Sequence, residues 1–114
     1  MRFMSFEVDG KHGLAVQQGS AWHGASVGSA HYCGTLETLL AAGGSALHDA
    51  AKKLRAAAEI DVAKIKILPP LSDPEKIVCV GLNYVDHSAE SGFKQPDFPT
   101  IFSRFNSSLI GHGA

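Results

Sequence analysis

The first part of the chain alternates between apolar and polar positions with a period of two. Residues 4–8 place Met, Phe and Val on one side and Ser and Glu on the other, which is typical of a half-buried strand. Asp9-Gly10 then predicts a hairpin turn, because glycine accepts a positive φ. A return strand would begin around residues 14–16. After a second turn at Gly19-Ser20, residues 21–27 predict a third, weaker strand.

The next stretch changes to a helical period. Thr35 can cap a first helix near residues 35–42, and Gly43-Gly44 ends it. Ser45 can cap a second helix over residues 46–58, whose apolar positions share one face: Leu47, Ala50, Ala51, Leu54 and Ala58. Three basic residues fall largely off that face and are interpreted as a solvated surface: Lys52, Lys53 and Arg55.

Residues 64–67 alternate once more and predict a short strand. Two proline-containing groups, Pro69-Pro70 and Ser72-Asp73-Pro74, then stop regular structure and predict a linker. The sequence therefore predicts two domains, a small N-terminal α/β domain over residues 1–70 and a second part over residues 75–114.

The second part is expected to consist mainly of strands. Residues 76–81 form a nearly continuous apolar run bounded by turn signals, which fits a buried strand. Asn83 can cap a short helical segment over residues 84–90, and residues 100–104 predict another strand. The fold class expected for the whole chain is α/β in the broad sense, that is α+β. Since this part ends without a final element, we expect it to be truncated and its apolar strands to self-associate.

The composition is that of an ordinary folded domain. Of the 114 residues, 45% are hydrophobic and 18% are charged, and the net charge is −1. Because positive and negative charges nearly cancel, the composition argues against nucleic acid or an anionic membrane as the main partner. Cys33 and Cys79 are too few for a disulfide framework. No apolar run reaches the ~20 residues of a membrane span and no signal peptide is recognisable, so we expect a soluble cytoplasmic protein.

A histidine and a glutamate stand three positions apart on the predicted helical segment. The side chains of His87 and Glu90 would share one face, where the carboxylate orients the imidazole and raises its basicity. This pattern favours a general base, although a surface pair or a helix cap has the same spacing. Arg104 ends a predicted strand among apolar residues. Its guanidinium needs an anionic partner there, either a structural carboxylate or a carboxylate of a substrate.

The remaining polar residues indicate no further chemistry. His12 is assigned to a turn, and the other histidines are scattered without the spacing of a metal-ligand set. Ser107 and Ser108 lack the Gly-x-Ser-x-Gly pattern of a nucleophile elbow. With Asn106 they are interpreted as hydrogen-bonding loop residues.

Two stretches of the chain together resemble the fumarylacetoacetate hydrolase family. The first runs from the Pro-Pro linker through the strand into Gly81-Leu82-Asn83-Tyr84 and continues to His87 and Glu90. The second lies within residues 98–109. The resemblance covers about residues 67–112. It points to the bacterial branch of fumarylacetoacetate hydrolase domain proteins, which includes 2-hydroxyhepta-2,4-diene-1,7-dioate isomerase-like enzymes.

The resemblance implies a catalytic domain built as a mixed β-sandwich roll, usually a homodimer, with a divalent metal in its pocket. That metal is commonly Mg²⁺, with Mn²⁺ or Ca²⁺ as alternatives. His87 and Glu90 match the catalytic dyad that activates water or moves a proton on a small metal-chelated oxo acid. Arg104 and Tyr84 match substrate-binding positions, although Tyr84 is also interpretable as a core tyrosine. The implied activity is C–C bond hydrolysis or enol–keto isomerisation, as in aromatic catabolism.

The metal ligands of the family have no counterpart in this sequence. The resemblance implies a Glu-x-Glu pair and a later Asp downstream of the matched motif, and no Glu-x-Glu occurs here. We therefore expect no metal ligand in this chain, which would be the N-terminal portion of a longer enzyme and inactive alone. The alternative is a non-catalytic assembly or binding module derived from that family, a role that residues 1–60 would suit.

Overall fold

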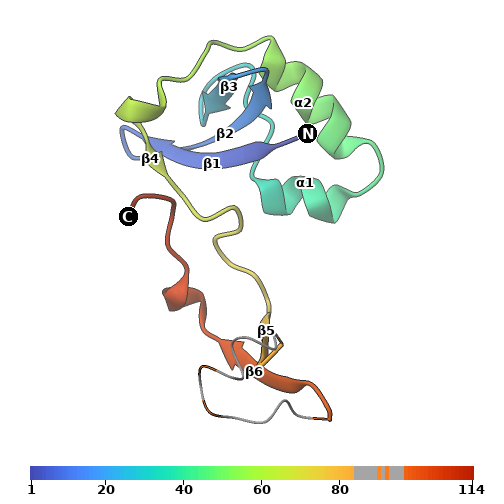
Figure 1. The fold of residues 1–114 in the computed structure, drawn as a ribbon. Coiled ribbons are helices and arrows are strands. Elements are labelled where there is room, and N and C mark those ends of the chain that lie inside the picture. The colour runs from blue at the N-terminus through green and yellow to red at the C-terminus, as the bar shows by residue number, and fades with distance from the viewer. Residues whose placement is uncertain (84–89, 91, 93–96) are drawn as a thin grey trace. The chain divides into compact units, whose positions relative to one another are not determined.

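The computed structural model of the chain describes residues 1–83, 90, 92 and 97–114 (Figure 1). Contacts between residues divide the chain into a first unit, Met1–Ser72 with Ile110–Ala114, and a second unit, Asp73–Leu109. The expected domains, residues 1–70 and 75–114, stay a prediction. Within the described ranges, no helix combines the length and the apolar character needed to cross a membrane.

The first unit is built on a four-stranded antiparallel sheet with the order β3-β2-β1-β4 (Figure 1). The strands are β1 (Phe3–Val8), β2 (Lys11–Gln18), β3 (Ala21–Ser26) and β4 (Lys66–Ile67). Asp9 and Gly10 join β1 to β2 with φ values of 50° and 68°. Positive φ values at both central residues are what a type I′ hairpin turn requires. The predicted hairpin is therefore confirmed, and β2 begins earlier than expected, at Lys11.

Two helices, α1 (Leu36–Ala42) and α2 (Ala46–Arg55), pack on one face of this sheet (Figure 1). The start of α1 is confirmed, because the Thr35 side chain accepts a hydrogen bond from the backbone N–H of Thr38 over 3.2 Å. The predicted cap of α2 is wrong. The hydroxyl of Ser45 donates instead to the carboxylate of Asp49 over 2.6 Å, and so satisfies no N–H of the helix.

The second helix is shorter than expected. It ends at Arg55 because the chain then runs along the outer edge of β3, where backbone pairing replaces helical bonds. Ala58 accepts a hydrogen bond from the N–H of Gly24 over 3.1 Å, and the N–H of Ile60 donates to Trp22 over 2.7 Å. This pairing covers an edge of the sheet that would otherwise be open to association.

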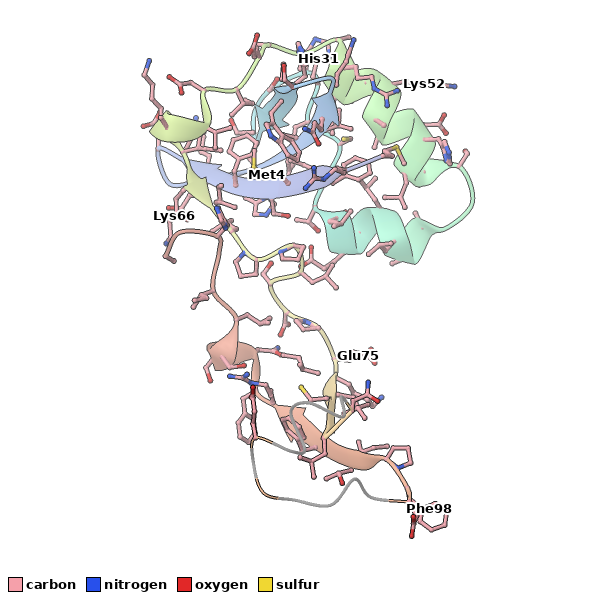
Figure 2. The ribbon with its side chains drawn as sticks, viewed as in Figure 1. Met4, His31, Lys52, Lys66, Glu75 and Phe98 are labelled. Atoms are coloured by element: carbon pink, nitrogen blue, oxygen red, sulfur yellow. The ribbon has the colours of Figure 1, made fainter. Side chains whose placement is uncertain are left out.

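A hydrophobic cluster lies on each face of the sheet. On the face covered by the helices, Leu14 and Val16 of β2 pack with Leu54 of α2, and all three are fully buried. The opposite face carries the buried Met4 and Phe6 of β1. The basic surface of α2 is exposed as predicted, and Figure 2 shows its labelled Lys52 pointing away from the sheet; the basic residues are Lys52, Lys53 and Arg55.

Residues 62–67 differ from the strand predicted over 64–67. Val62–Lys64 form a short 3₁₀ helix, because the carboxylate of Asp61 caps it by accepting a hydrogen bond from the N–H of Ala63 over 3.1 Å. The pairing with β1 is limited to Lys66–Ile67. A local side-chain cap has therefore replaced the first half of the predicted strand.

The second unit contains an antiparallel ribbon of β5 (Ile77–Gly81) and β6 (Thr100–Arg104), followed by a 3₁₀ turn at Asn106–Ser108. Both strands are confirmed as strands. The expectation that the first of them is buried is wrong for the described residues, since Val78 is 61% and Val80 is 47% exposed. Among the described residues these two strands pair only with each other, and the face that carries Val78 and Val80 is exposed, whereas Ile77 and Cys79 on the other face are half-buried.

Helices and antiparallel sheets together make the chain an α+β protein, as expected. The mixed β-sandwich roll that the family resemblance implies for the second part stays a prediction.

Candidate functional site

The predicted site residues lie only partly within the described structure. Tyr84 and His87 are outside the described residues, as is most of the helical segment predicted over 84–90. Glu90 and Arg104 are described, and both are exposed. The pairing of His87 with Glu90 therefore stays a prediction, and so do the substrate-binding roles of Tyr84 and Arg104.

Arg104 ends β6 opposite Ile77, the first residue of β5. Side chains alternate across a strand, so Arg104 shares one face of the ribbon with Phe102 and with Cys79, the cross-strand partner of Phe102. Among the described residues, no carboxylate lies within ion-pair distance of Arg104. A guanidinium beside apolar side chains is suited to an organic acid, whose carboxylate it can hold with two parallel hydrogen bonds.

A small cavity lies where β5 ends and β6 begins. Its volume is about 220 Å³, and it is lined by Val80, Gly81, Leu82, Asn83, Asp97, Phe98 and Pro99. Figure 2 shows the labelled Phe98 in the loop that leads into β6. The Asn83 amide can both donate and accept hydrogen bonds, and the Asp97 carboxylate accepts them. The cavity is smaller than the 300–1,000 Å³ typical of pockets for drug-sized ligands, and therefore suits only a small polar group.

One residue of this cavity has an unusual backbone. Leu82, between Gly81 and Asn83, has a φ of 52°, in the left-handed region that a leucine rarely adopts. Strain of this kind is concentrated at functional sites. Neither Asn83 nor Asp97 was predicted as a site residue. The Gly-x-Asn-Tyr motif was the one available signal, and it does not reveal the conformation of its second residue.

Polar residues after β6 make local hydrogen bonds. The side-chain N–H of Asn106 donates to Asp73 over 2.5 Å, and the hydroxyl of Ser108 donates to the carbonyl oxygen of Phe105 over 2.8 Å. The interpretation of these two residues as hydrogen-bonding loop residues is therefore confirmed.

The described ranges of the chain contain no group of three His, Cys, Asp or Glu side chains that could hold a metal ion. Two histidines of the first unit have a ring nitrogen close to a polar atom of the same unit. His12 lies within β2 and not in a turn as predicted, with Nδ1 3.4 Å from the hydroxyl of Tyr32. The Nδ1 of His23 lies 3.1 Å from the carbonyl oxygen of Ala57. The described residues therefore do not fit a divalent-metal site.

The cysteine of the first unit is not an activated nucleophile. Burial raises the pKa of the Cys33 thiol above its ordinary value, although the nearby Lys53 lowers it. The pKa of the adjacent Tyr32 is also raised, by burial first and then by the charges of Cys33 and Glu37. The reactive form of cysteine is the thiolate, and a raised pKa keeps the thiol protonated at neutral pH.

A comparison with known protein families matches the part of the chain that contains the β5–β6 ribbon. Residues 76–114 match the family described as Fumarylacetoacetate (FAA) hydrolase, C-terminal. They include β5, β6 and the cavity at the ends of these strands.

Three relatives extend this comparison. The chain is 47% identical over 49 residues to oxaloacetate tautomerase fahd2, mitochondrial, of Xenopus laevis, which covers 43% of this chain and 15% of the relative. Its identity to oxaloacetate tautomerase FAHD2A, mitochondrial, of Homo sapiens is also 47% over 49 residues, 43% of this chain and 16% of the relative. Oxaloacetate tautomerase Fahd2a, mitochondrial, of Rattus norvegicus is 40% identical over 78 residues, 68% of this chain and 25% of the relative.

The chain spans a quarter or less of the length of these curated relatives. The family match and the relatives agree with each other. They show that the chain belongs to the fumarylacetoacetate hydrolase family, whose enzymes include hydrolases and tautomerases.

Proposed function

We propose that this chain is part of an enzyme that interconverts the enol and keto forms of a small oxo dicarboxylic acid. The observation that carries the proposal is the similarity of this chain to relatives named oxaloacetate tautomerases, at 40–47% identity over 49 to 78 residues. C–C bond hydrolysis needs the same polarised carbonyl and the same base. The names of the relatives favour proton transfer over bond cleavage.

The reaction requires a base at the carbon beside the carbonyl group. In the proposed site the His87 imidazole takes a proton from that carbon, and the imidazolium then gives this proton to the oxygen of the resulting enolate, which forms the enol; the reverse transfers return the keto form. Glu90 orients the imidazole and stabilises its protonated form. Both side chains are restored at the end of the cycle, so neither is consumed in the reaction.

Substrate binding is assigned to Arg104 and Tyr84. The guanidinium of Arg104 would hold one carboxylate of the substrate. Arg104 is exposed at the end of β6, so its guanidinium is accessible to a ligand. Tyr84 would line the pocket.

The family resemblance also supports a divalent metal, Mg²⁺ or alternatively Mn²⁺ or Ca²⁺, and a homodimer. The described residues do not form a site for such a cation. The ligands of such a cation would therefore have to come from sequence other than these residues.

A second candidate function is a non-catalytic assembly or binding module. The observation that favours it is the apolar surface of the ribbon, where Val78 is 61%, Ile101 is 67% and Phe102 is 50% exposed. A surface of this kind is suited to burial against other polypeptide.

The test uses the longest natural polypeptide that contains these 114 residues, supplied with Mg²⁺ or Mn²⁺. The rate of enol–keto conversion is measured for oxaloacetate, and the rate of C–C hydrolysis is measured for an acylpyruvate. We expect conversion of oxaloacetate to be accelerated and to be the faster reaction. A folded, metal-loaded polypeptide that accelerates neither reaction would contradict the enzyme proposal, and the assembly or binding module would then be the remaining candidate function.

A further inference from the structure

The proline-containing segment after β4 is fastened to the first unit at three points. The N–H of Leu68 donates to the carbonyl oxygen of Ser5 over 2.9 Å, and the Ser5 hydroxyl donates to the carbonyl oxygen of Pro70 over 3.2 Å. Both the N–H and the hydroxyl of Ser72 donate to one carboxylate oxygen of Glu37, over 2.5 and 3.0 Å. These bonds connect positions far apart in sequence, so they are tertiary contacts of the segment.

Ser5 is suited to this task by its burial. Its side chain is 3% exposed in an otherwise apolar core, and a buried hydroxyl needs a hydrogen-bond partner. Pro69 and Pro70 have no N–H and cannot continue the pairing of β4 with β1. The segment therefore leaves the sheet but stays attached to it through the carbonyl oxygen of Pro70.

Glu37 makes the last attachment as an anion. Burial tends to raise its pKa, but hydrogen bonds from Ser72, from its own backbone N–H and from Thr35 outweigh this effect and lower the pKa to about 2. The carboxylate is consequently ionised at neutral pH, and hydrogen bonds to an ionised acceptor are roughly twice as strong as neutral ones.

We propose that residues 68–72 form a strap that is closed by the Glu37 carboxylate and belongs to the first unit as fixed structure, not as a flexible linker. The second unit begins at the next residue, Asp73. The Asp73 carboxylate in turn accepts the hydrogen bond from Asn106 within that unit. Two residues held by different units are thus separated by a single peptide bond.

The strap is independent of the proposed catalytic function, so its test needs no substrate. Amide hydrogen exchange, resolved to single residues, is measured on the 114-residue chain. The variants are Glu37→Ala and Glu37→Gln, with Glu59→Gln as the matched control, since Glu59 is an exposed carboxylate of the same unit. The amide of Leu68 is the internal reference, because its acceptor is the backbone of β1.

We expect the Ser72 amide of the wild type to exchange at least about tenfold more slowly than the same sequence unfolded. Glu37→Ala should remove most of this protection, Glu37→Gln part of it and Glu59→Gln none, with Leu68 protected throughout. Chymotrypsin should also cleave after Leu71 faster in Glu37→Ala than in the wild type.

Three results would contradict the proposal that residues 68–72 form a strap closed by Glu37. One is a Ser72 amide that is unprotected in the wild type. Another is protection of Ser72 that Glu37→Ala leaves unchanged. The third is simultaneous loss of protection at Ser72 and Leu68 in Glu37→Ala, because Glu37 would then support the whole unit and not the strap.

Discussion

The aromatic ring of Phe6 lies against the backbone of Gly13, its cross-strand partner, and fills the space that a side chain at Gly13 would need. The ring is 1% exposed and belongs to the cluster on the face of the sheet opposite the helices. Gly13 is therefore required for its lack of a side chain, in the middle of a strand where glycine is otherwise unfavourable.

Gly13→Ala should destabilise the first unit by about 1–3 kcal/mol, the usual cost of forcing an extra group into a packed core. Equilibrium denaturation followed by the fluorescence of Trp22 measures this change. The cost should be smaller in a Phe6→Leu background, because the smaller side chain leaves room for the new methyl group. Equal costs in the two backgrounds would show that the Phe6 ring is not the obstacle.

The carboxylate of Glu37 should give the first unit an acid-sensitive contribution to stability. Its pKa is lowered to about 2 in the folded chain, below the ordinary value of 4.5. A depressed folded pKa stabilises the folded state above the unfolded pKa, and this contribution is lost as the pH falls from about 4.5 toward 2. An NMR titration should place the midpoint of Glu37 well below the ordinary value of 4.5. In Glu37→Gln the unfolding free energy should vary less with pH over this interval, and an unchanged profile would rule out the linkage.

The left-handed backbone of Leu82 predicts an unusual response to substitution. A non-glycine residue in this region costs about 1–2 kcal/mol, so Leu82→Gly should stabilise the turn after β5 or leave it unaffected. Leu82→Val should weaken it, because a β-branched side chain fits this conformation least. Urea denaturation, followed by the amide signals of β5, measures the stability of each variant relative to the wild type. A more stable valine variant would contradict the observed conformation.

The ribbon of the second unit should associate through its uncovered apolar face. Side chains alternate, so Val78, Val80 and Ile101 lie on the same face, and each is about half exposed or more. Sedimentation of the 114-residue chain should show concentration-dependent assembly, which Val78→Lys reduces. Val27→Lys is the control, since Val27 is 48% exposed in the first unit. A monomer at all concentrations would show that the ribbon needs no partner.

Local chemistry made the early elements predictable from sequence. Asp9-Gly10 dictates its turn and Thr35 its cap within a few residues, and both predictions are confirmed. The end of α2 was mispredicted because β3 competes for the backbone of residues 58–60, a partner far away in sequence. The burial of β5 was mispredicted because an apolar run shows that a strand prefers to be buried, not what covers it.

The candidate site likewise has features that could be predicted from the sequence and features that could not. The position of Arg104 at the end of a strand followed from the apolar pattern of residues 100–104 and is confirmed. The left-handed Leu82 was not predictable, because leucine carries no local signal for that conformation. The pairing of His87 with Glu90 was inferred from spacing and resemblance and falls outside the described residues.

Two variants should separate substrate binding from proton transfer in the active polypeptide. Arg104→Ala should mainly raise KM, because it removes the partner of a substrate carboxylate, and Arg104→Lys should restore part of the affinity. Glu90→Gln should lower kcat, because it removes the charge that orients the imidazole. Steady-state kinetics with saturating Mg²⁺ or Mn²⁺ measures both effects. A fall in kcat alone for Arg104→Ala would remove Arg104 from substrate binding.

The proposed proton transfer depends most directly on His87, and kcat for oxaloacetate enol–keto conversion by the His87→Ala variant of the longest natural polypeptide tests it. A general base contributes roughly 10²–10⁴-fold, so kcat should fall by about that factor while KM and metal affinity change little. His48→Ala, at an exposed histidine of α2, is the matched control and should keep the wild-type kcat. A folded, metal-loaded His87→Ala variant with wild-type kcat would contradict the proposed mechanism.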